Sequence, residues 1–235
     1  TAITLTGSGF LSGGAVTVGG VPCASVVVVS PTSVTCNTPA NSLGTKDIVF
    51  TNSDAQSGTL PSAFTYQPAP VISSVSPIAG PLAGSTTITL TGTGFLSGAA
   101  VTLDGSTCGS VNIISSTQLT CVTPAHAAAA VDVVILNPDA QASSLVNGFT
   151  YQPAPTLSSI SPSSGTMLGN TLLTLTGTNF LSGATVSIDG SACTSPTVVS
   201  STQIPCRTPA GAVGTANVTV TNFDNQSDTL VASFT

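Results

Sequence analysis

The sequence predicts an all-β protein made of three tandem β-sandwich domains in an extended rod. Landmark residues recur at a constant offset, since Cys23, Cys108 and Cys193 each lie 85 positions apart in the 235-residue chain. Such a constant period identifies a tandem repeat. Apolar and hydroxyl-bearing residues alternate over short segments between turn residues, which is typical of half-buried strands. No segment has a convincing helical period.

The repeat predicts three domains, at residues 1–67, 68–152 and 153–235. A unit of this length is close to the size of a small β-sandwich. The first domain lacks the opening segment of the repeat and is expected to lack its first strand. Two explanations stay open at this point. The chain is a window of a longer array, or a neighbouring subunit supplies the missing strand, as in donor-strand assembly.

The second domain gives the strand pattern in its most complete form. Prolines at both ends of 70–77 predict an edge strand, because proline is tolerated only at edges and strand ends. The Gly- and Pro-rich stretch 78–85 is expected to be a loop. Further strands are expected, in order, at 87–91, 100–103, 111–114, 118–121, 131–136 and 145–151.

Turn residues separate these strands. Gly92 to Phe95 predicts a bulge or tight bend, with Phe95 in the core. Asp104-Gly105 is a hairpin-type pair, and 137–141 has the composition of a turn. About seven short strands with turns at this spacing predict an immunoglobulin-like sandwich.

The joints between domains carry the same five residues, Tyr-Gln-Pro-Ala-Pro. Proline has a fixed φ and no N–H donor, so it stops a ladder and holds the chain extended. We expect stiff linkers in which the tyrosines pack against the joint. The candidate linker residues are Tyr66, Pro68 and Pro70 at the first joint, and Tyr151, Pro153 and Pro155 at the second.

Each domain has two cysteines thirteen positions apart. Metal clusters usually need four ligands, and no histidine recurs with the cysteines. Disulfides within each domain are therefore expected, pairing Cys23 with Cys36, Cys108 with Cys121, and Cys193 with Cys206. A loop of this size stabilises by roughly 3 kcal/mol in the chain-entropy model. Disulfides indicate an extracellular or otherwise oxidising compartment, whereas free thiols would require a reducing one.

The chain has two basic residues, eight aspartates and no glutamate, which gives a net charge of −6. Without a basic patch the chain is not expected to bind nucleic acid or an anionic membrane. No apolar run reaches the ~20 residues needed to cross a bilayer. A surface of hydroxyls and amides with few ions suits packing against other copies or a sugar coat.

The motifs of the second domain, "SVSPIAGPLAGSTTITLTGTGF", "AVTLDGSTC", "SSTQLTCVTPA" and "VVILNPDAQAS", resemble the IPT/TIG domain. The third domain carries equivalent motifs, and the first carries all but the opening one. The resemblance implies an early-set immunoglobulin-like β-sandwich. It implies no single function, because such domains occur in receptors, transcription factors, polysaccharide-active enzymes and bacterial surface proteins.

No catalytic, cofactor or metal site is expected. The single histidine, His126, is interpreted as an exposed loop residue, and no nucleophile-elbow sequence is present. Asp54, Asp139 and Asp224 recur in a short polar motif. We interpret them as turn formers, with a weak calcium site as the alternative.

Together these features predict a non-enzymatic extracellular structural protein that forms a microbial surface stalk, fibre or filament. Assembly could include strand exchange between subunits, and the expected partners are other copies of the chain. The alternative is an adhesin or carbohydrate-binding module of a larger secreted or surface protein, with glycans as partners.

Overall fold

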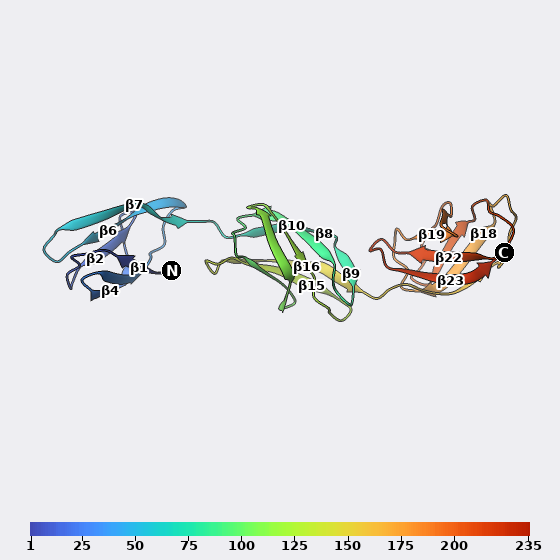
Figure 1. Ribbon diagram of the computed structural model, residues 1–235, viewed down its shortest axis with the longest axis horizontal. Helices are drawn as coiled ribbons and strands as arrows, with labels where there is room; N and C mark the ends of the chain where they lie inside the picture. The colour runs from blue at the N-terminus through green and yellow to red at the C-terminus, as the bar shows by residue number, and fades with distance from the viewer. The chain divides into compact units, whose positions relative to one another are not determined.

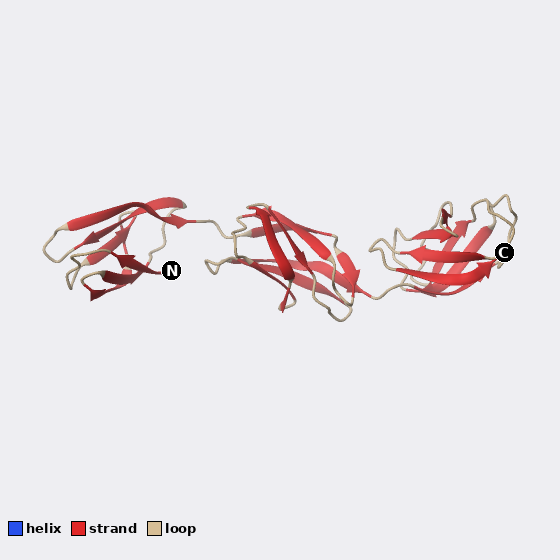
Figure 2. Cartoon of the chain, in the orientation of Figure 1, coloured by secondary structure: helices blue, strands red, loops and turns tan.

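The computed structural model describes the whole chain, Thr1–Thr235, and consists of strands, turns and loops without a helix (Figure 2). This confirms the all-β prediction. No helix is therefore long and apolar enough to span a bilayer. The chain divides into two compact units, Thr1–Pro70 with Asp139–Gln141, and the remainder. The remainder contains two separate buried cores, so we describe three modules, each with its own core.

Module 1 comprises β1–β7 (Figure 1). One sheet has the order β1-β5-β4 and the other the order β3-β2-β6-β7. The strands are β1 (Ala2–Thr6), β2 (Ala15–Val18), β3 (Val21–Pro22), β4 (Ala24–Ser30), β5 (Ser33–Asn37), β6 (Gly44–Thr51) and β7 (Ser57–Tyr66).

Module 2 comprises β8–β16 and has the largest strand set. Its sheets have the orders β13-β14-β10-β8 and β12-β11-β15-β16-β9. The strands are β8 (Val71–Ser76), β9 (Ala79–Pro81), β10 (Thr87–Thr93), β11 (Ala100–Leu103), β12 (Ser106–Thr107), β13 (Gly109–Ser115), β14 (Gln118–Val122), β15 (Ala129–Leu136) and β16 (Ala142–Gln152).

Module 3 comprises β17–β23, in sheets of order β17-β18-β21 and β20-β19-β22-β23. It has no counterpart of β13; in its place Thr194 and Ser200 form isolated bridges to β21. The strands are β17 (Thr156–Ser161), β18 (Leu172–Thr178), β19 (Thr185–Ile188), β20 (Ser191–Ala192), β21 (Gln203–Arg207), β22 (Ala216–Thr221) and β23 (Ser227–Phe234).

The alternation read from the sequence is what builds each core. In β10, Ile88 and Leu90 point inward and are fully buried, while Thr89 between them is half-buried and the flanking Thr87 and Thr91 are exposed. Successive side chains of a strand point to opposite faces, so one face of each sheet becomes apolar. Phe95 is 2% exposed, which confirms its predicted place in the core.

Two expectations for module 2 need correction. The stretch 78–85 is not only a loop, because Ala79–Pro81 forms β9 and pairs in parallel with the end of β16. Strand β10 also does not end before Gly92: it continues to Thr93, with a register shift between Thr91 and Gly92. The bulge keeps the strand paired with β8 while it bends. With β9 and the two-residue strand β12, nine strands form where about seven were expected.

Candidate functional site: an open edge and an open pocket

The cysteine pairs lie in the cores. The Sγ atoms of Cys108 and Cys121 are 2.7 Å apart, and both side chains are buried. Cys193 and Cys206 are buried in the same places of module 3, whereas in module 1 Cys36 is buried and Cys23 half-buried. All six predicted residues are thus brought together as the three expected pairs, and their oxidation to disulfides stays a prediction.

Cys36 is a poor candidate for a nucleophile. Burial raises the pKa of Cys36 to about 12, with the contact to Cys23 acting in the same direction. A catalytic thiol needs a lowered pKa, because the thiolate is the reactive form. The arrangement of Cys36 therefore favours a structural role.

The linkers are short. Four residues separate β7, which ends at Tyr66, from β8, and three residues separate β16 from β17. Pro70 and Pro155 are buried, while Pro68 is exposed and Pro153 half-buried. Pro70 and Pro155 directly precede strands β8 and β17.

The recurring aspartates form turns. The Oδ1 atoms of Asp54, Asp139 and Asp224 each accept the N–H of the residue two positions later, at 3.1 Å in all three modules. This is the side-chain to backbone hydrogen bond expected of an Asx turn. The turn interpretation accounts for the repeated motif without an ion.

Tyr151 is a core residue, and Tyr66 is half-buried against the core of module 1; neither packs on the linker as the sequence predicted. Tyr151 is 1% exposed, and its hydroxyl donates to the carbonyl oxygen of Pro124 at 2.9 Å. Tyr66 makes the same bond to Pro39 at 2.7 Å. Burial raises the pKa of Tyr151 to about 12. The last residue of the Phe-Thr-Tyr motif therefore closes the end of its own sandwich.

His126 differs from the exposed residue that the sequence predicted. Its ring stacks on that of Tyr151, with centroids 5.0 Å apart. Its Nε2 lies 3.2 Å from Oδ2 of Asp104, and 19% of its side chain is exposed. The hydrogen bond with the Ala127 carbonyl and then the Asp104 carboxylate raise the pKa of His126. His126 covers the buried tyrosine.

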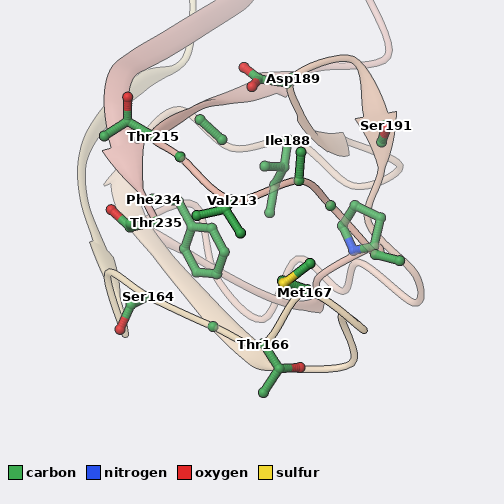
Figure 3. Close-up of a pocket in the computed structure, with 17 residues that line it drawn as sticks. Ser164, Thr166, Met167, Ile188, Asp189, Ser191, Val213, Thr215, Phe234 and Thr235 are labelled. Atoms are coloured by element: carbon green, nitrogen blue, oxygen red, sulfur yellow. The ribbon is translucent and has the colours of Figure 1, made fainter.

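Module 3 has a pocket of about 610 Å³ at the corresponding end. The side chains of Val213, Phe234 and Met167 point toward one another in it, and Ser164 lies at its edge (Figure 3). Pro209 and Gly211 of its lining stand 85 positions after Pro124, which accepts the Tyr151 hydroxyl, and His126, which stacks on the Tyr151 ring. The pocket is thus the place that a tyrosine fills in module 2.

Module 1 has an open edge with a groove of about 310 Å³. Strand β1 pairs only with β5, whereas its counterparts β10 and β18 each have a second neighbour, β8 and β17. The groove is lined by residues of β1, by Phe10, and by β6 and β7 residues that include Phe50 and Leu60. It occupies the position that β8 covers in module 2.

Sequence reasoning recognised the missing first strand but neither of these two openings. Both are formed by residues far apart in the chain, such as Leu5 with Leu60, or Met167 with Val213. The 85-residue offset is the signal that could have found them, since it pairs apolar lining residues such as Leu5 and Phe10 with the buried Leu90 and Phe95.

The comparisons with known proteins agree with the fold. The IPT/TIG domain model matches residues 1–66, 70–151 and 155–235. Fibrocystin-L of Homo sapiens is 31% identical over 159 residues, which is 65% of this chain and 4% of that protein. Plexin-2 of Caenorhabditis briggsae is 35% identical over 112 residues, 46% of this chain and 6% of that protein. The chain thus spans a small fraction of these relatives.

Among solved structures, the Plexin A4 full extracellular region, domains 1 to 10, aligns with a TM-score of 0.47 and 18% identity. The alignment covers 100% of this chain and 27% of that one. A surface glycan-binding protein of Prevotella bryantii aligns with a TM-score of 0.33 and 16% identity, over 69% of this chain and 41% of that one. Similarity this low says nothing about a ligand. With three family matches that together cover nearly all its residues, the chain belongs to the IPT/TIG domain family.

Proposed function

We propose that the chain is a non-enzymatic extracellular structural protein whose modules form a stalk, fibre or filament at a microbial surface. One observation carries this proposal: three modules with separate cores follow one another with linkers of only three or four residues. Linkers this short, with two prolines each, act as stiff spacers. Domains 1–67, 68–152 and 153–235 would then form a rod.

The extracellular location rests on the cysteine pairs. Three cysteine pairs at one spacing, with five of the six side chains buried, are suited to disulfides, which persist in oxidising compartments. A small module has a limited core, so a covalent link within it adds a useful share of its stability. The charge-poor, hydroxyl-rich surface supports close packing with other copies of the chain.

Solution scattering and electron microscopy test this proposal. We expect the purified chain to be elongated in small-angle X-ray scattering, and to form higher-order particles or fibres as its concentration rises. A compact monomer by light scattering at every concentration, with no fibres in micrographs, would contradict the fibre proposal.

A further inference from the structure

The turn that contains the recurring aspartate also contains a glutamine whose side chain the turn itself does not need. We propose that Gln141 and Gln226 each clamp the linker that precedes their own module, by donating a side-chain hydrogen bond to the main chain of that linker. The inference rests on the proposed function for its purpose, because a stalk needs stiff joints. The clamp can nevertheless be tested on a chain that forms no fibres.

The same contact occurs at both linkers. Nε2 of Gln226 lies 3.0 Å from the carbonyl oxygen of Gln152, and Nε2 of Gln141 lies 3.2 Å from that of Gln67. The first pair lies within one compact unit of the chain and the second pair within the other. Both acceptors are the glutamine of the repeated Tyr-Gln-Pro-Ala-Pro linker. The prolines that follow have no N–H groups, so a side chain supplies the hydrogen bond that holds the linker.

The aspartate of the motif orients the clamping glutamine. Oδ2 of Asp224 accepts a hydrogen bond from Nε2 of Gln226 at 2.8 Å, and Asp139 does the same for Gln141 at 2.9 Å. The amide nitrogen carries two N–H groups, so one reaches the carboxylate and the other reaches the linker. A hydrogen bond to a charged acceptor is stronger than one between neutral groups. The aspartate therefore shapes the turn and also restrains the glutamine side chain.

The turn is firmly attached to the body of its module. Asn222, its first residue, is 2% exposed. The Asn222 amide accepts the N–H of Leu181 at 3.1 Å and donates to the carbonyl oxygen of Asn179 at 2.8 Å. Asn137 is equally buried and makes the equivalent two bonds in module 2. A linker that is bound by the glutamine is thereby bound to the body of the module that follows it.

The second linker is held at a point that the first lacks. Nδ2 of Asn179 donates to the carbonyl oxygen of Ala154 at 3.0 Å. Module 2 has Gly94 at the position of Asn179, and glycine has no side chain to donate. Pro153 of the second linker is half-buried, whereas Pro68 of the first is exposed. We therefore expect the second joint to be the stiffer of the two.

Nuclear spin relaxation of the backbone amides of the full chain tests the clamp. In the unmodified chain we expect modules 2 and 3 to tumble with one rotational correlation time. The double variant Gln226→Ala, Asn179→Gly removes both side-chain bonds to the linker, so module 3 should lose this common value and tumble faster. The main-chain bond of Gln226 to Asp224 remains, so the turn should stay folded. Gln203→Ala changes an exposed glutamine of the same module without a side-chain hydrogen bond and should have no effect.

The first joint gives an independent check. Gln141→Ala alone should free module 1 from module 2, because no other side chain donates to residues 67–70. Unchanged correlation times in both variants, or an equal change in Gln203→Ala, would overturn the proposal. Independent tumbling of all three modules in the unmodified chain would contradict both the clamp and the stalk. Joints that are stiff only with their glutamines, in a chain that forms no fibres, would support the clamp and contradict only the fibre proposal.

Discussion

Modules 1 and 2 have the same residues at equivalent core positions, but module 2 buries these side chains more completely. Leu90 and Phe95 are sealed in module 2, whereas Leu5 and Phe10 are only half-buried in module 1. The residue types at these positions are identical, and the difference is strand β8, which contacts both β10 and β16. The comparison shows that the first strand of the repeat mainly shields core side chains from solvent. The other strands of both sheets pair without it in module 1.

The largest expected loss of stability comes from replacing Phe95, and the equivalent Phe10 provides the comparison. Phe95→Ala should destabilise module 2 by about 3–5 kcal/mol, the usual range for a buried phenylalanine. Phe10→Ala should destabilise module 1 by only about 1–2 kcal/mol, because its ring is already half-exposed. Denaturant unfolding followed by module-resolved hydrogen exchange measures both. Equal losses would mean that β8 does not seal the core.

All three modules have a cysteine pair. Removing the pairs should therefore leave the difference in core burial between modules 1 and 2 unchanged. If the pairs are oxidised, reduction should lower the stability of each module by roughly 3 kcal/mol. Thermal unfolding with and without a reductant measures this, with the Cys108→Ser, Cys121→Ser double variant as the control that isolates module 2. Unchanged stability after reduction would contradict the disulfide prediction.

Adding a Cβ atom at Gly92 of module 2 or at the equivalent Gly7 of module 1 tests the effect of β8 on its own. Gly92→Ala should destabilise module 2 by about 1–3 kcal/mol, since the new methyl group overlaps the backbone of β8. Gly7→Ala should cost about 1 kcal/mol or less, because only the edge of the Phe10 ring has to move. Chemical denaturation of the two single variants measures both losses in unfolding free energy. A larger loss at Gly7 than at Gly92 would contradict the role assigned to the covering strand.

The smallest effect concerns the tyrosine that closes module 2. Tyr151→Phe removes one hydrogen bond to Pro124 and should cost about 0.5–1.5 kcal/mol at neutral pH. The folded-state pKa of Tyr151 is raised to about 12, so its stabilisation is fully present below the unfolded pKa near 10. It is lost as the pH rises from about 10 through 12.

The difference between Tyr151→Phe and the unmodified chain should therefore narrow over that range of pH. Thermal melts from pH 7 to pH 12 measure it. A constant difference across the range would show that Tyr151 ionises as freely in the folded state as in the unfolded one.

Much of the fold followed from local patterns. The alternation in 87–91 and 131–136, and the prolines around β8, predicted strands that the structure contains. Strand β9 was missed because Gly80 and Pro81 have low strand propensity, and its pairing with Tyr151 depends on residues 71 positions away. The half-buried His126 was missed for the same reason, since its stacking on Tyr151 has no signature within its own loop. The openings in modules 1 and 3 depend on packing between sheets, which a linear pattern does not contain.

Amide hydrogen exchange of the full chain tests the central claim most directly, by comparing 2–6 of β1 with 87–91 of β10. The account predicts that 2–6 exchange faster in the free chain, because the outward N–H groups of Thr4 and Thr6 have no strand beside them. Equal protection of the two segments would contradict it.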